Sequence, residues 1–125
     1  MNIRKTLILV AVFGLILSGA YLMNPVEAQS NSITLTAKLT IKAGKENEFE
    51  TLMKGVVPKV RQESGNRAYT MLRSKKDPRV FLFFEEYADQ AAIQAHGQHL
   101  KELGLDFSAF LDGPVVAEYY DKIAF

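Results

Sequence analysis

The amino-acid sequence predicts one α+β domain with a ferredoxin-like order of elements: strand, helix, strand, strand, helix, strand. Three segments lead to this prediction. Residues 33–42 alternate between apolar and polar, residues 49–60 carry apolar side chains at helical spacing, and residues 80–84 are apolar throughout. Two helices can cover only one face of an antiparallel sheet. Because residues 80–84 are apolar on both faces, we expect the bare sheet face to pack against a second copy of the chain.

Residues 1–28 have the plan of a secretory signal peptide. A short basic start precedes an uncharged apolar run from Thr6 to Met23, and Val26-Glu27-Ala28 places small residues at the two positions that signal peptidase reads. Cleavage after Ala28 would deliver the protein to the periplasm or the medium. The alternative is an uncleaved membrane anchor, since about 18 apolar residues can just span a bilayer.

Residues 29–32 are expected to form a polar linker and residues 33–125 the domain. Removal of the leader takes Arg4, Lys5 and Glu27 from totals of 15 Lys+Arg and 14 Asp+Glu, which leaves the two signs balanced. The lack of a basic stripe argues against a nucleic-acid partner, and a membrane is expected as a partner only if the leader is retained. The chain has no cysteine. This excludes thiol catalysis and thiolate metal sites, and it means that packing or dimerisation must stabilise the domain.

The predicted elements are bounded by residues that start, stop or interrupt regular structure. Pro58 lies inside the first helical pattern and is expected to kink or divide that helix near Gly55, because proline removes a backbone hydrogen bond. Gly65 is expected to cap the helix end, and Asp89 is expected to start the second helix. The expected strands are residues 33–42, 67–74, 80–84 and 114–121, with a turn at residues 76–78.

Polar side chains gather where the apolar segment 80–84 leads into the second helix. Glu85, Tyr87 and Asp89 follow the strand directly, and His96 lies two turns into the helix. We expect these side chains to surround one pocket. Any activity is therefore predicted at this strand-to-helix junction.

The same region carries a series of short motifs. An acidic residue, a spacer and Gly precede a strand with a Tyr. A charged turn with Asp-Pro then leads into an apolar strand that ends in Glu-x-aromatic-x-Asp, and an Ala-rich stretch ends in Ala-His. In this order and spacing the chain resembles the antibiotic biosynthesis monooxygenase domain, from about Ile33 to Tyr120. The motifs are Glu63-Ser64-Gly65, Tyr69, Asp77-Pro78, Glu85-Glu86-Tyr87-Ala88-Asp89 and Ala91-Ala92-Ile93-Gln94-Ala95-His96.

The resemblance implies a dimeric α/β barrel and a small monooxygenase that works without metal, flavin or haem. We therefore expect a homodimer, no cofactor, and a small quinol or phenol as substrate. Haem degradation, known in the same fold, is disfavoured because the chain has no Trp and Leu35 stands where that branch has Asn. Two alternatives stay open. One is a non-catalytic periplasmic module that binds a small aromatic or quinone-like molecule, and the other is an isomerase of small oxygenated metabolites.

His96 and Glu85 are the expected catalytic residues, because they match the family's His and Glu. An imidazole titrates near neutrality and can take a proton from a phenol, and Glu85 would orient it. Structural alternatives remain for both residues. His96 could bond Glu85 for stability alone, and Glu85 could be a salt link at the sheet edge.

The expected substrate-binding residues are aromatic, with one cation among them. Tyr69, Tyr87 and Tyr119 can line an apolar cavity with their hydroxyls toward a ligand, and Phe83 shares the strand face of Glu85. Arg73 could steady an anionic intermediate. The alternatives are core aromatics with satisfied hydroxyls and an arginine at the surface.

His99 lies three residues after His96, on nearly the same face of the predicted helix. These two histidines and Glu85 resemble part of a metal-ligand set. Gly97 weakens the helix between them and no further ligands cluster nearby, so we expect no metal site.

Overall fold

The computed structural model describes residues 31–124, and the leader predicted at residues 1–28 lies outside this range. The described elements are β1 (Ile33–Thr40), α2 (Glu46–Val60), β2 (Asn66–Arg73), β3 (Val80–Tyr87), α3 (Gln90–Glu102), the short 3-10 helix η1 (Phe107–Ala109) and β4 (Val116–Tyr120). Within residues 31–124, no helix has both the length and the apolar character needed to cross a membrane.

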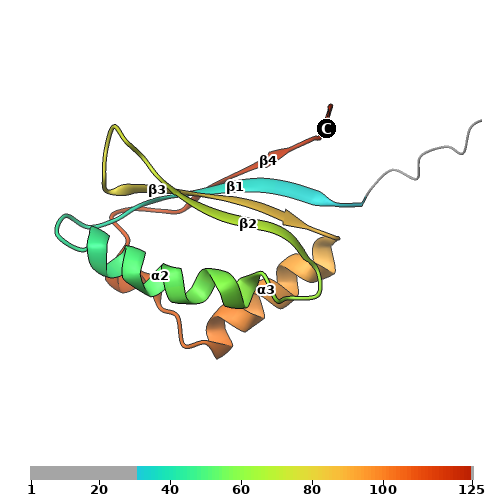
Figure 1. The fold of residues 1–125 in the computed structure, drawn as a ribbon, viewed down its shortest axis with the longest axis horizontal. Coiled ribbons are helices and arrows are strands. Elements are labelled where there is room, and N and C mark those ends of the chain that lie inside the picture. The colour runs from blue at the N-terminus through green and yellow to red at the C-terminus, as the bar shows by residue number, and fades with distance from the viewer. Residues whose placement is uncertain (1–30, 125) are drawn as a thin grey trace, which may run out of the picture. The chain divides into compact units, whose positions relative to one another are not determined.

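The four strands form one antiparallel sheet in the order β2-β3-β1-β4. Both helices pack on the same face of this sheet, and the other face carries none of the described helices (Figure 1). The predicted α+β, ferredoxin-like fold with two main helices on one face is therefore confirmed.

The hydrophobic core lies between the helices and the sheet. Phe49 of α2 occupies its centre, with ring centroids 5.0 Å from Phe81 and 6.4 Å from Phe83 of β3. The apolar stripe predicted for this helix is buried, because residues three and four apart share one helix face. Its buried members are Phe49, Met53, Val56, Val57 and Val60.

The first helix is continuous, so the expectation that Pro58 divides it near Gly55 is wrong. Pro58 lies in the last turn, where it removes only one hydrogen bond close to the helix end. Val56, Val57 and Val60 are buried around it, and their packing holds the turn against the sheet.

The expectation that Gly65 caps this helix is also wrong. The C-cap is Arg61, whose N–H donates to the Val57 carbonyl, and Gly65 does not have a positive φ. Gly65 is required for a different reason: a Cβ atom there would collide with the side chain of Ala92 in α3 and lie 3.2 Å from its Cα. The Gly65 carbonyl also accepts a hydrogen bond of 2.8 Å from Ala88 N–H. Gly65 therefore allows the turn after α2 to approach α3 closely.

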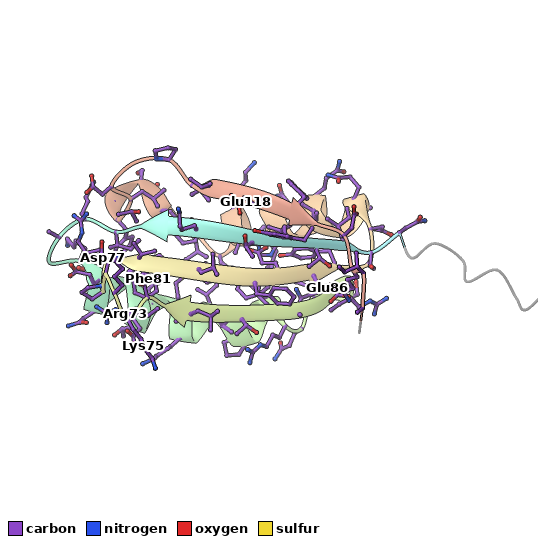
Figure 2. The ribbon with its side chains drawn as sticks, turned by 90° about the horizontal axis from the view of Figure 1, so that it is seen from above. Arg73, Lys75, Asp77, Phe81, Glu86 and Glu118 are labelled. Carbon is purple, nitrogen blue, oxygen red and sulfur yellow. The ribbon has the colours of Figure 1, made fainter. Side chains whose placement is uncertain are left out.

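The sheet face away from the helices retains large apolar side chains in contact with solvent. Leu72 of β2, Phe84 of β3, and Val116 and Tyr120 of β4 are all exposed there, on the face toward the viewer in Figure 2. β4 is exposed at every position. The doubly apolar β3 thus has one face in the core and one face that no described element covers.

Two glycine substitutions test whether the contact between Gly65 and α3 is a packing constraint. Gly65→Ala should lower the free energy of unfolding by about 1–3 kcal/mol, because the added methyl overpacks against Ala92. Gly55→Ala, in the open surface of α2 with no neighbour within 4 Å, should instead raise it by about 0.5–1 kcal/mol. Urea denaturation measures both, and equal effects of the two substitutions would contradict the packing argument.

Candidate functional site

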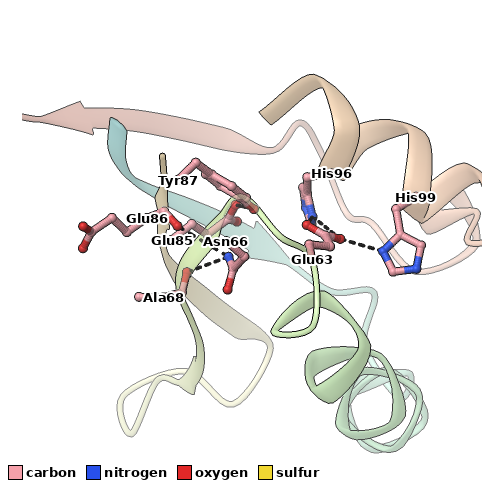
Figure 3. Close-up of polar contacts among 8 residues, drawn as sticks. All are labelled: Glu63, Asn66, Ala68, Glu85, Glu86, Tyr87, His96 and His99. Carbon is pink, nitrogen blue, oxygen red and sulfur yellow. Dashed lines mark hydrogen bonds and ion pairs between the residues drawn. The ribbon is translucent and has the colours of Figure 1, made fainter. Parts of the chain in front are cut away.

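One carboxylate and two imidazoles form a cluster between the turn after α2 and helix α3 (Figure 3). The His96 Nδ1 atom lies 3.1 Å from each carboxylate oxygen of Glu63, and the His99 Nδ1 atom lies 2.7 Å from Glu63 Oε1. The side chains of Glu63 and His96 are 12% and 10% exposed, whereas that of His99 is 30% exposed. The cluster therefore runs from a buried imidazole to one that reaches the surface.

Local structure places the two sides of this cluster. Asp89 caps α3, because its side chain accepts the Ala92 N–H at 2.8 Å. From this start, His96 and His99 follow one turn apart on the same helix face. Glu63 is held in its turn by its N–H donating to the Val60 carbonyl and by its carbonyl accepting from Asn66 N–H, both at 3.0 Å.

The hydrogen-bond partner of His96 is Glu63, not Glu85 as expected. Glu85 is buried on β3 and accepts a hydrogen bond of 2.7 Å from the Tyr87 hydroxyl. Glu63 belongs to the first of the family motifs, but it lies 33 residues from His96 in sequence. Its place in that motif was the one sequence signal that could have identified Glu63 as a site residue. Sequence spacing alone could not pair it with a helix that docks from so far along the chain.

Aromatic rings surround the buried imidazole. The His96 ring lies 5.5 Å from the Tyr69 ring and 5.3 Å from the Tyr87 ring, measured between centroids. Tyr69 in turn lies 5.4 Å from Phe83. Because alternate residues of a strand share a face, β2 and β3 bring Tyr69, Phe83, Glu85 and Tyr87 together on the helix side. The structure thus gathers His96 with four of the other six expected site residues.

Arg73 and Tyr119 lie elsewhere. Arg73 is at the opposite end of β2, next to the turn into β3 (Figure 2), and its guanidinium bonds Glu50 at 2.8 Å, Asn47 at 3.2 Å and the Pro78 carbonyl at 2.7 Å. It thus links the end of β2 and the turn before β3 to α2. Tyr119 is on the edge strand β4 and is 66% exposed. In a single chain, neither residue joins the cluster around His96.

Burial shifts the ionisation of the acidic groups near His96. Desolvation raises the pKa of Glu85, and this is opposed by the Tyr87 hydrogen bond and by the charge of His96. Desolvation, reinforced by the negative charge of Glu85, also raises the pKa of Tyr69 and Tyr87 far above that of an ordinary phenol. Both tyrosines therefore stay neutral near pH 7 and can act only as hydrogen-bond donors or acceptors.

The contact with Glu63 determines which imidazole nitrogen of His96 is available for chemistry. An ionised carboxylate only accepts hydrogen bonds, so with Glu63 in that form the Nδ1 atom beside it carries the proton. In neutral His96 the lone pair is then on Nε2, the atom that can accept a proton. Among residues 31–124, no three His, Cys, Asp or Glu side chains are arranged to hold a metal ion.

The comparisons with known proteins agree with this fold and these motifs. The profile of the antibiotic biosynthesis monooxygenase family matches residues 32–102. The chain belongs to this family. No curated protein matches its sequence at a significant level.

Solved structures of the family's fold cover most of the chain. A protein from Caulobacter crescentus, proposed to be an antibiotic biosynthesis monooxygenase, is 29% identical with a TM-score of 0.67, over 77% of this chain and 93% of that one. A conserved protein from Methanosarcina mazei is 28% identical with a TM-score of 0.66, over 75% and 96% of the two chains. A protein from Pseudomonas aeruginosa, 24% identical, has a TM-score of 0.69 over 77% and 98%, which shows the fold alone.

The substitution Glu85→Gln tests the electrostatic state of the buried strand carboxylate. Burial raises the folded-state pKa of Glu85, so the folded protein favours the protonated carboxyl. The stability that Glu85 contributes is therefore present at low pH and is lost as pH rises through the folded-state pKa. Glutamine cannot ionise and still accepts the Tyr87 hydrogen bond. We expect the variant to melt above the wild type at about pH 7 and level with it at about pH 4.

The matched control is Glu86→Gln, on the opposite sheet face, where Glu86 pairs with Lys122. This substitution loses a partly exposed ion pair and should cost about 0–1 kcal/mol at neutral pH. Thermal melting across this pH range measures both variants. A lower melting temperature for Glu85→Gln at pH 7 would show that the ionised carboxylate stabilises the fold.

Proposed function

We propose that this protein is an exported, cofactor-independent monooxygenase that oxidises a small quinol or phenol, with His96 as the general base. The observation that supports this most directly is the buried His96, oriented through Nδ1 by Glu63 and faced by the rings of Tyr69 and Tyr87. The export part of the proposal rests on the leader sequence, and N-terminal sequencing that begins at Gln29 would support it.

The proposed reaction begins with proton removal from the substrate. His96 Nε2 takes the phenolic proton, and Glu63 stabilises the resulting imidazolium through Nδ1–H. The phenolate is electron-rich enough to transfer an electron to oxygen, and the two radicals combine into a peroxide. For a quinol, loss of water from the peroxide then leaves one oxygen atom in a hydroxyquinone and releases the other as water. His96 returns its proton in this last step, so substrate and oxygen balance without a further reductant.

The neighbouring side chains suit this chemistry. Tyr69, Phe83 and Tyr87 give aromatic surface against which a planar substrate can pack. Because both tyrosines stay neutral, they do not compete with the substrate for the base. A non-catalytic binding module would use the same aromatic surface, but it would not need an imidazole oriented by a buried carboxylate. This pairing is why we favour an enzyme.

Oxygen uptake by variants of His96 and Glu63 tests the proposed base. With anthrone and a panel of para-quinols, and after subtraction of spontaneous oxidation, His96→Ala should lower the rate about 100- to 10,000-fold. Glu63→Gln should cost less, because an amide can still accept the Nδ1 hydrogen bond although it cannot balance the charge. Gln98→Ala, an exposed substitution between the two histidines, is the control and should keep the rate.

Each assay is paired with a thermal melt and repeated with a metal chelator. A folded His96→Ala variant with a near-native rate would refute the assignment of the base. Ligand binding without oxygen consumption by the wild type would favour the binding module, and substrate conversion without oxygen consumption would favour the isomerase.

We also propose that the protein is a homodimer joined through the open sheet face. The family is commonly dimeric, and this face carries exposed Leu72, Phe84, Val116 and Tyr120. Apolar area removed from water stabilises an interface by about 25 cal/mol per Å². A second copy is a suitable occupant because its own open face has the same apolar character.

The substitution Phe84→Glu tests this interface. A charge introduced at the centre of the apolar sheet face should shift the protein from dimer to monomer at micromolar concentration, because burying an unpaired carboxylate is costly. Thr51→Glu, on the exposed surface of α2, should leave the dimer intact. Light scattering measures the mass of each protein, and a monomeric wild type would refute the proposed dimer.

A further inference from the structure

Three buried side chains around the candidate site each keep one polar atom that bonds no residue in the range 31–124. These atoms are His96 Nε2, the Tyr69 hydroxyl oxygen and Glu85 Oε1, and their residues are 8%, 5% and 7% exposed. We propose that Tyr69 and Glu85 form a second polar anchor that binds a hydroxyl group of the ligand, so that the site takes an aromatic ring with two hydroxyls. The role of His96 on the first hydroxyl rests on the proposed function, whereas the anchor can be tested by binding alone.

The unbonded atoms of Tyr69 and Glu85 remain open to solvent. Among the buried side chains of residues 31–124, every polar atom that is fully removed from water has a hydrogen-bond partner. The Tyr69 hydroxyl and Glu85 Oε1 lack a partner, so both still contact solvent although their residues are buried. A ligand that covers them must replace the water with hydrogen bonds of its own, because burial of an unbonded polar group is costly.

The sheet places Tyr69 and Glu85 side by side. They are opposite each other in the register of β2 and β3, and directly opposed residues of an antiparallel pair have Cβ atoms about 4.5–5.5 Å apart. The Tyr87 hydroxyl donates to Glu85 Oε2 at 2.7 Å (Figure 3). This bond holds the carboxyl group in place and leaves Oε1 as its free oxygen.

The anchor lies next to the proposed base. Tyr69 connects the two, because its ring lies 5.5 Å from the His96 ring and its register partner is Glu85. The Tyr87 ring, whose hydroxyl bonds Glu85, lies 5.3 Å from the same imidazole. An aromatic ring packed against these side chains can therefore place one substituent at His96 and another at Tyr69 and Glu85.

The hydrogen-bonding properties of the anchor indicate a hydroxyl group. A phenol both donates and accepts, and a carboxyl oxygen accepts when ionised and can donate when protonated. A ligand hydroxyl also does both, so it can bond Tyr69 and Glu85 at once in either state of the carboxyl group. A ligand with hydrogen in that place would leave both groups unpaired, which corresponds to a loss of about 10- to 100-fold in affinity.

Anaerobic binding measurements test the anchor without oxidation of the probes. The probes are hydroquinone, catechol and phenol, and calorimetry on the full-length protein gives the dissociation constant of each. We expect the wild type to bind at least one of the two diols about 10- to 100-fold more tightly than phenol. In Tyr69→Phe and Glu85→Leu this ratio should fall toward one. In Glu85→Gln, which keeps a hydrogen-bonding oxygen, it should fall less.

The substitution Tyr69→Phe also separates a ligand contact from a structural one. The Tyr69 hydroxyl bonds nothing in the described chain, so its removal should leave the melting temperature unchanged while the binding ratio falls. Tyr120→Phe is the matched control. The Tyr120 hydroxyl bonds Glu118 at 2.6 Å on the open sheet face, and its removal should leave the binding ratio at the wild-type value.

The proposal is overturned by a Tyr69→Phe variant that keeps the wild-type ratio, or by a wild type that binds phenol as tightly as both diols. It is also overturned if no probe binds at millimolar concentration. A lower melting temperature for Tyr69→Phe would overturn it as well, since the hydroxyl would then stabilise the fold.

Oxygen uptake distinguishes failure of the anchor from failure of the proposed oxygenase. Preferential binding of a diol by a protein that consumes no oxygen would retain the anchor and refute the oxygenase. Uptake that depends on His96, in a wild type that binds diol and phenol equally, would retain the oxygenase and refute the anchor. If both proposals hold, Tyr69→Phe should raise KM for the diol more than it lowers kcat, because the anchor acts in binding.

Discussion

The contact between the turn after α2 and helix α3 is the interaction on which the cluster of Glu63, His96 and His99 depends. Gly65 allows the two backbones to approach, because any larger residue would collide with Ala92. The hydrogen bond from Ala88 N–H to the Gly65 carbonyl fastens the start of the helix to this turn. With the helix held there, Glu63 lies opposite the face that carries His96 and His99. A small backbone requirement thus determines where the imidazoles meet a carboxylate.

The pleat of the sheet adds the second half of the site. Successive strand residues point to opposite faces, so the register of β2 against β3 brings Tyr69 and Glu85 opposite each other on the helix side. The same alternation directs Leu72 and Phe84 to the open face. A single pattern therefore forms both the aromatic surroundings of His96 and the apolar surface that we assign to a second copy.

Two carboxylates lie near His96, and their surroundings give them different properties. Glu85 is buried among core side chains with one hydroxyl donor, so desolvation dominates and raises its pKa. Glu63 instead lies in the turn after α2, with Nδ1 of two imidazoles within hydrogen-bond distance of its carboxylate. The carboxylate that bonds His96 is the one in the turn, and the one on the strand is buried and bonded to Tyr87.

The sequence by itself determined the order of elements, the inward face of the first strand and the position of His96 on the second helix. These features follow from local periodicity and from motifs that lie close together in the chain. They can therefore be predicted without knowledge of the tertiary structure. Only the tertiary structure decided that Glu63, rather than Glu85, bonds His96, and that Arg73 is engaged with α2 at the far end of the sheet. Both depend on how distant segments dock. Glu63 and His96 are 33 residues apart, and packing and burial bring such distant partners together, which residue spacing does not record.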